Sequence, residues 1–232
     1  MVQASQRTTV RGPTFIRLLA RLTDVGVTQS NPSLSDRLSH WLDWTQAIAL
    51  STALDGRPSA PAADGHAFGS AEEDECARMR SALADAICND AELAALKQQE
   101  ARQGGDNVAV DYTPFRQRYL AMQRRMQTAT GHLRGRLRDM LAGKSPDMAR
   151  LAEVDAVMER ALSPREQTLL ASVPTVLGDH FERLRQADAQ RADNAASAWL
   201  DVFCRDMQSV LLAELDVRFQ PVEGLLAALR TR

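Results

Sequence analysis

The segment from Thr113 to Gly143 constrains the fold of this chain more than any other. Apolar side chains recur there at alternating steps of four and three residues: Phe115, Tyr119, Met122, Met126, Ala129, Leu133, Leu137 and Met140. At 100° per residue, these side chains fall within about 40° on either side of one line. The spacing predicts one long helix with a narrow apolar edge, called here the 113–143 seam. Such a seam needs a covering surface, either in the same chain or in a partner.

The rest of the chain also favours helices. Runs of β-branched residues that would indicate strands are missing, and aromatic content is low at 5%. Three pairs of Ser or Thr followed by Pro predict helix starts at Thr113-Pro114, Ser145-Pro146 and Ser163-Pro164. We therefore expect an all-α protein, an irregular helical bundle with long coiled-coil-like helices.

Other helix boundaries follow from capping and breaking residues. Pro13 precedes a short amphipathic helix that ends near Gly26, and Ser33 with Asp36 resembles a capping box for the next. That second helix is expected to run to Leu54, with an apolar stripe of Leu34, Leu38, Trp41, Ile48 and Thr52. Later expectations are a third helix from Ser70 with a kink or restart near Asn89-Asp90, an end at Gly104-Gly105, a kink or end at Pro174, either one helix over 175–219 or a break near Asn194, a stop at Pro221 and a short helix over 223–229.

Composition along the chain suggests three regions. Residues 55–70 are rich in Pro, Gly, Ala and small polar residues and show no periodicity, which is typical of a mobile linker. We expect an N-terminal helical segment over residues 1–54 and a helical bundle over 71–232. Whether the N-terminal helices join that bundle in one domain is left open by the pattern.

The chain shows no sequence feature of export or membrane insertion. Residues 1–13 carry basic side chains without an apolar stretch of signal-peptide length, and no later stretch approaches a membrane span. Cys76 and Cys88 fall on one expected helix, where twelve residues mean a rise of roughly 18 Å, too far for a disulfide. With Cys204 they read most simply as three buried apolar side chains. We expect a cytoplasmic protein.

Seven arginines share the helix that carries the seam: Arg116, Arg118, Arg124, Arg125, Arg134, Arg136 and Arg138. A basic helix could bind nucleic acid, and Arg124, Arg134 and Arg138 lie furthest from the seam. The competing interpretation is a surface that pairs with acidic neighbours, because the arginines surround the helix and the net charge of the chain is only −2. No aromatic side chains interleave with them to stack bases. The pairing interpretation is favoured.

A histidine and two tryptophans were weighed as site residues. His180 lies on an apolar stripe with no second histidine at helical spacing, so a buried histidine with one hydrogen bond is favoured over a metal ligand. Trp41 is expected in the core. Trp44, on the adjoining edge of its helix, is a candidate for partner binding because tryptophan is enriched in binding hot spots.

Catalytic sequence motifs are missing from the chain. We find no GxSxG, Walker loop, GxGxxG, HExxH or CxxC, and we assign no catalytic residue, cofactor or metal. The leading hypothesis is a non-enzymatic helical scaffold or adaptor that contacts itself or a protein partner. Its candidate partner-binding residues are Phe115, Tyr119, Met122, Met126, Leu133 and Leu137 of the seam, together with Trp44. The alternative is nucleic-acid binding through the arginine-rich helix 113–143.

Two N-terminal stretches carry a family resemblance. FIRLLARLTDVGV and LSDRLSHWLDWTQAIALSTAL resemble the start of an uncharacterised proteobacterial family of about 230-residue helical proteins, carried as a domain of unknown function. The resemblance is specific in the first third of the chain and looser beyond it. It implies an accessory role beside envelope-associated proteins similar to the OmpA and MotA/TolQ types. It carries over no catalytic residue.

Overall fold

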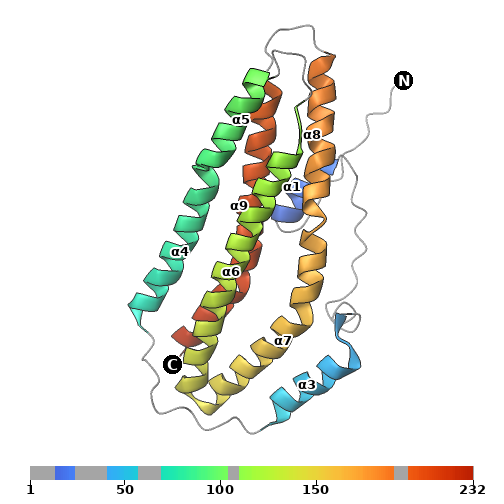
Figure 1. Cartoon of the computed structure of the whole chain (residues 1–232). Coiled ribbons are helices and arrows are strands. Elements are labelled where there is room, and N and C mark those ends of the chain that lie inside the picture. Colours follow the sequence, from blue (N-terminus) through green and yellow to red (C-terminus); the bar gives the residue numbers. More distant parts are fainter. Residues whose placement is uncertain (1–13, 24–40, 57–68, 104–109, 191–197, 232) are drawn as a thin grey trace, which may run out of the picture. The chain divides into compact units, whose positions relative to one another are not determined.

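The computed structural model describes residues 14–23, 41–56, 69–103, 110–190 and 198–231 (Figure 1). Within these ranges the regular elements are α-helices, and no strand occurs. The all-α prediction is confirmed. The helices are α1 (Thr14–Thr23), α3 (Trp44–Asp55), α4 (Ser70–Cys88), α5 (Ala91–Gln103), α6 (Thr113–Lys144), α7 (Pro146–Leu170), α8 (Val173–Ala189) and α9 (Ala198–Arg230).

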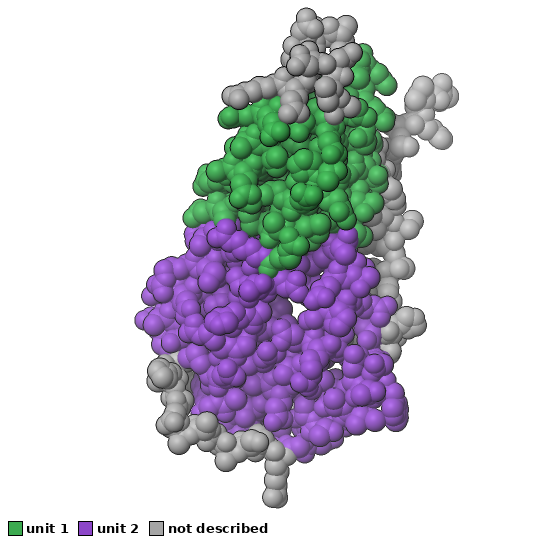
Figure 2. Space-filling view, in the orientation of Figure 1, with its two compact units in different colours: residues 1–30, 84–124, 172–217 green, residues 31–83, 125–171, 218–232 purple. Residues whose placement is uncertain are grey.

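Two compact units divide the chain, and each is assembled from three separate stretches of sequence (Figure 2). Unit 1 comprises residues 1–30, 84–124 and 172–217, and unit 2 comprises residues 31–83, 125–171 and 218–232. Helices α4, α6 and α9 contribute residues to both units. Most of the predicted linker, residues 57–68, lies outside the described residues, so the expected division into 1–54 and 71–232 stays a prediction.

Aromatic side chains from α6, α8 and α9 form the core of unit 1. Phe115, Phe181 and Phe203 are 0% exposed, and the ring centroid of Phe181 lies 5.0 Å from that of Phe203 in an edge-to-face arrangement. The hydroxyl of Tyr112 donates a hydrogen bond to the carbonyl of Pro174 at 2.5 Å. Gly178 allows this approach, because a Cβ atom there would lie 2.9 Å from the Tyr112 ring. The start of α6 is thereby held against α8.

The short helix α1 packs against α8 in the same unit. Its two buried side chains, Phe15 and Leu22, lie seven residues apart and so share one face of the helix. Arg183 of α8 donates a hydrogen bond to the carbonyl of Leu22, and this contact satisfies one of the last carbonyls of α1.

Ion pairs and helix caps connect the elements of unit 2. Arg80 of α4 lies over the ring of Phe219 at 5.7 Å and pairs with Glu223, which joins α4 to α9. The ammonium of Lys144, the last residue of α6, donates to the carbonyl of Leu229 at 2.5 Å. A cation at this position satisfies terminal carbonyls of α9 and complements the negative end of the helix dipole.

The second predicted helix is wrong at its start. α3 begins at Trp44, and Leu42 and Asp43 are not helical. The reason is a capping box, in which the Asp43 carboxylate accepts from the Gln46 amide N–H at 2.7 Å while the Asp43 amide donates to Gln46 Oε1 at 3.1 Å. The stripe that was expected to continue from Trp41 is thus interrupted. Its earlier part, including Ser33 and Asp36, lies outside the described residues.

Two prolines were wrongly expected at helix ends. α7 passes through Pro164 to Leu170, and α9 passes through Pro221 to Arg230. An internal proline removes one backbone hydrogen bond, at a cost of about 3 kcal/mol. The helix that follows Pro221 buries four apolar side chains, namely Val222, Leu225, Leu226 and Leu229. Their burial offsets that cost, at about 1.5–3 kcal/mol for each large side chain.

The remaining boundary predictions agree with the helices found. α6 begins at Thr113 and α7 at Pro146, with the Ser145 hydroxyl accepting from the Met148 amide. α4 ends at Cys88 and α5 restarts at Ala91, where Asp90 accepts from the Leu93 amide at 3.0 Å. α8 ends at Ala189 and α9 begins at Ala198, in keeping with the broken-helix alternative. Asn194 and the Gly104-Gly105 pair lie outside the described residues.

Cysteine burial was predicted correctly at two of three positions. Cys76 and Cys204 are buried, whereas Cys88, the last residue of α4, is exposed. All three are free thiols. Burial raises the pKa of the Cys204 thiol to about 12 and also raises the pKa of Cys76, so both thiols are neutral and unreactive near pH 7.

Candidate interaction surface

The 113–143 seam lies inside the chain. Its predicted partner-binding residues are Phe115, Tyr119, Met122, Met126, Leu133 and Leu137, and each is between 0 and 3% exposed. In unit 1, Phe115 contacts Phe181 of α8 and Phe203 of α9, with ring centroids 5.8 and 5.6 Å apart. Helices of the same chain therefore cover these side chains, and a partner would reach them only if those helices separated.

A buried polar cluster interrupts the apolar seam in unit 1. Glu214 of α9 is 0% exposed. Its carboxylate accepts from the Tyr119 hydroxyl at 2.6 Å and from the Gln123 side-chain amide at 3.0 Å. Both donors lie on α6, four residues apart and hence on one face. A buried carboxylate is tolerated only when donors replace water, so these hydrogen bonds fix how α6 and α9 pair in this unit.

The arginines of α6 are largely paired with acids, as the pairing interpretation predicted. Arg118 contacts Asp90 and Glu92 in unit 1, and Arg136 contacts Glu75 in unit 2. For Arg118, the hydrogen bond to Asp90 raises the pKa of the guanidinium above its ordinary value. Within the described residues, Arg116, Arg124 and Arg125 make no ion pair and are exposed.

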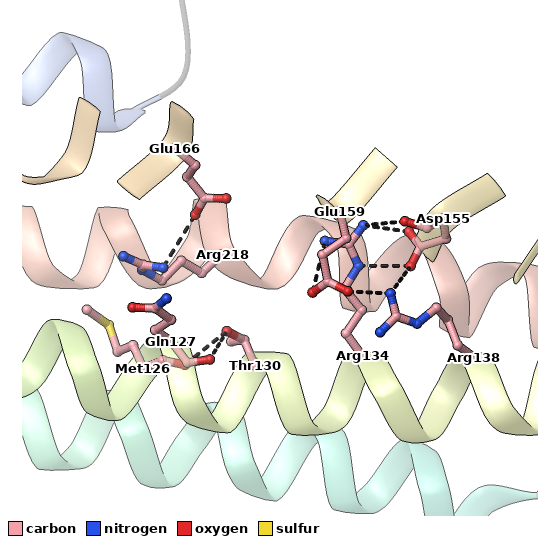
Figure 3. A network of polar contacts seen from close by, with 9 residues as sticks. All are labelled: Met126, Gln127, Thr130, Arg134, Arg138, Asp155, Glu159, Glu166 and Arg218. Atoms are coloured by element: carbon pink, nitrogen blue, oxygen red, sulfur yellow. Dashed lines mark hydrogen bonds and ion pairs between the residues drawn. The ribbon is translucent and has the colours of Figure 1, made fainter. Parts of the chain in front are cut away.

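Arg134 and Arg138 meet the acids of α7 in a shared network (Figure 3). Arg134 contacts Asp155 through two nitrogens, at 2.9 and 2.7 Å, and Arg138 pairs with Glu159. The two arginine side chains are 16 and 19% exposed. Neither projects freely into solvent, which counts against their assignment as nucleic-acid contacts.

Arg124 is the exposed member of the three arginines that were singled out. It lines an open groove of about 560 Å³ between α5 and α6, together with Gln99, Gln117 and Arg118. Glu92 also lines this groove and pairs with Arg118. The groove thus contains both signs of charge and no aromatic side chain, an unsuitable surface for stacking bases.

His180 has the environment that its sequence position predicted. Its Nε2 lies 2.8 Å from Asp206 Oδ2, and its side chain is 12% exposed. Arg21 of α1 approaches the other oxygen of Asp206 at 3.5 Å. Among the described residues, no three His, Cys, Asp or Glu side chains are grouped so that they could hold a metal ion. The contact joins helices of unit 1.

The most unusual surface of unit 2 is on α3, whose sequence WTQAIALSTALD is apolar around most of its circumference. Trp44 is 81% exposed, Ile48 50% and Leu54 53%. With the exposed Ala47 and Ser51 they occupy an arc of about 120° at 100° per residue. We call these five residues the α3 outer face. A helix that is apolar all round is normally covered on every side, and this one is not.

The opposite side of α3 packs against α7. Ala53 is its buried residue. Trp41, just before the helix, is half-buried, with the guanidinium of Arg165 lying 5.9 Å from its ring centroid. The prediction that Trp41 is a core residue is therefore wrong. The break at Leu42 and Asp43 separates Trp41 from α3, so the expected stripe of Trp41, Ile48 and Thr52 does not form one buried face.

Sequence reasoning found Trp44 but missed Ile48 and Leu54. Ile48 was assigned to a buried stripe, because the helix was expected to begin ten residues earlier. Two signals could have identified the face: the Asp43-x-x-Gln46 capping pattern and a stretch from Trp44 to Leu54 without any charged residue. A surface helix ordinarily carries charged residues on its solvent side.

Comparison with known proteins identifies a family and no solved relative. The family model described as "Protein of unknown function (DUF3348)" matches residues 1–231. No curated protein and no solved structure matches the chain. No helix in the described part combines the length and apolar content needed to cross a membrane.

Proposed function

Since the chain belongs to the DUF3348 family of unknown function, its role must be argued from its own residues, and we propose that it is a non-enzymatic helical adaptor. It binds a protein partner through the α3 outer face. The observation that carries the proposal is an uncharged apolar helix face with a tryptophan 81% exposed at its start. Exposed apolar side chains gathered on one element, rather than scattered singly, are typical of interaction sites.

The energetics of the α3 outer face favour binding. A tryptophan that becomes buried in an interface commonly contributes 2 kcal/mol or more. Ile48 lies one helical turn from Trp44, and Leu54 extends the apolar surface toward the end of the helix. Burying these three side chains removes apolar area from water at roughly 25 cal/mol per Å².

The helix that presents the face is ordered before any partner arrives. The Asp43–Gln46 capping box closes its first turn, and α7 supports its inner side. A face that is already helical loses little conformational entropy on binding, so more of the contact energy appears as affinity. This is the property expected of an adaptor.

Affinity capture from the native host tests the adaptor proposal. Wild-type protein is compared with Trp44→Ala and with Leu169→Ala, a control that removes a side chain 62% exposed on α7. We expect at least one partner to be retained by wild type and by the control but lost from Trp44→Ala. Identical partners for all three proteins would contradict the proposal.

The family resemblance supports a finer assignment. We propose that this adaptor works in the cytoplasm of a proteobacterium, as an accessory to an envelope complex of the OmpA or MotA/TolQ type. The support comes from the resemblance of the N-terminal third. Fractionation of native cells tests it: we expect the protein in the soluble fraction after high-salt washing and partly with membranes at low salt. Its absence from membranes under mild lysis would contradict the envelope role.

Nucleic-acid binding through the arginine-rich helix is the second candidate and rests on the exposed Arg124. We expect no electrophoretic shift of DNA or RNA at low salt and micromolar protein. A shift that falls steeply with salt and disappears in the Arg124→Ala, Arg134→Ala, Arg138→Ala triple variant would promote this candidate above the adaptor.

A further inference from the structure

The α3 outer face is uncharged along its length and ends in an acid on either side. Asp43 caps the start of the helix and Asp55 is its last residue; both are exposed. Twelve residues at 1.5 Å per residue place their backbones about 18 Å apart. Asp55 accepts from the Ser51 hydroxyl at 3.2 Å and Asp43 from the Gln46 amide, so neutral groups contact both. Within the described part of the chain, neither carboxylate is in an ion pair.

This charge pattern disfavours a second copy of the chain as the occupant. In an antiparallel pair of α3 helices, Asp43 of each copy would face Asp55 of the other. In a parallel pair, each aspartate would face its own equivalent. Both arrangements oppose like charges at both ends of the contact. The face is also small, roughly 18 Å by 10 Å, well below the ~800 Å² per partner of a stable interface.

We propose that the α3 outer face binds an apolar helical segment of a partner protein that carries Lys or Arg on both sides of an uncharged stripe. The basic residues lie about twelve positions apart, so that each reaches one aspartate while the stripe covers Trp44, Ile48 and Leu54. This inference rests on the proposed adaptor function and specifies the chemistry of its partner. The acids exclude acidic apolar segments, and the apolar centre excludes fully charged ones.

Two synthetic helical peptides are suitable probes. Both are 18-residue, alanine-rich, fluorescein-labelled peptides with leucines at helical spacing on one face. One carries Lys at two positions twelve residues apart, and the other carries Glu at the same positions. Fluorescence anisotropy with the full chain at low ionic strength is expected to show about tenfold tighter binding of the Lys peptide.

Variants separate the apolar contribution from the charged one. Trp44→Ala is expected to weaken binding of the Lys peptide at least about tenfold, whereas the control Leu169→Ala leaves it unchanged. The double variant Asp43→Asn, Asp55→Asn is expected to abolish the preference for Lys over Glu. Asparagine caps a helix as well as aspartate does, so this variant keeps the start of α3. Circular dichroism verifies that each variant is folded.

Each outcome supports or overturns the inference. A Lys preference that depends on both aspartates and on Trp44 supports it. Equal binding of the two peptides through Trp44 overturns the charge requirement and leaves the adaptor proposal standing. Binding of neither peptide, with a mass that doubles on concentration and depends on Trp44, makes a second copy the occupant and overturns the inference. Binding of neither peptide by a chain that stays monomeric overturns it too, and host capture independent of Trp44 then removes the adaptor proposal as well.

Discussion

The 113–143 seam and the α3 outer face are both apolar helix surfaces, yet one is buried and the other is exposed. Met126 on the seam is 0% exposed, and Trp44 on α3 is 81% exposed. The seam follows a strict helical period beside seven arginines, whereas α3 has no charged residue before Asp55. Periodicity therefore identified the surface that the chain covers itself. The missing charge identified the surface that remains available.

A buried lysine gives the largest expected difference between the two surfaces. Met126→Lys places a charge where no water can reach it, and we expect a loss of at least about 4 kcal/mol, enough to unfold a domain of ordinary stability. Trp44→Lys is the matched change on the exposed face and is expected to alter stability by less than about 0.5 kcal/mol. Chemical denaturation monitored by circular dichroism measures both. Equal losses would remove the distinction between the surfaces.

The polar cluster on the seam gives an intermediate effect. Tyr119→Phe removes a donor from the buried Glu214 carboxylate, and we expect a loss of about 1.5–3 kcal/mol. The matched control is Tyr112→Phe, which removes a hydrogen bond to the neutral carbonyl of Pro174, for an expected loss of about 0.5–1.5 kcal/mol. Urea denaturation compares the two. A larger loss for Tyr112→Phe would show that the buried acid does not depend on Tyr119.

Surface pairing on α6 gives the smallest effect. Arg134 is 16% exposed and contacts Asp155 through two nitrogens, so Arg134→Ala is expected to cost about 1–2 kcal/mol. Arg136 and Glu75 are 43 and 36% exposed, so Arg136→Ala is expected to cost less than about 0.5 kcal/mol. Repeating both measurements at 1 M salt sharpens the comparison. An equal and fully salt-sensitive loss would mean that Arg134 is as solvated as Arg136.

Local pattern predicted the helices that depend on their own sequence. The seam residues and the Thr113-Pro114 start defined α6 almost to the residue, because the spacing of a helix is a local property. Pro164 and Pro221 were misread because tertiary packing decides whether a helix continues past a proline. Burial of Leu225 and Leu229 beyond Pro221 is such packing, and no local rule contains it.

The candidate surface was only partly predictable. Trp44 was identified from residue type, while Ile48 and Leu54 were not, because their exposure depends on which side of α3 packs against α7. Glu214 had a readable signal, since it is a single acid inside the apolar run Val210 to Leu215. Its donors Tyr119 and Gln123 lie about ninety residues away, and only the fold brings them together.

The thermal unfolding midpoint measured over a hundredfold range of protein concentration tests most directly whether the chain covers its own seam. If the 113–143 seam is closed within one chain, unfolding is unimolecular and the midpoint is the same at every concentration. We expect a constant midpoint for wild type and for Trp44→Ala, with full helicity retained at the lowest concentration. A midpoint that falls steadily on dilution would show that a second copy covers the seam and would contradict the internal core described here.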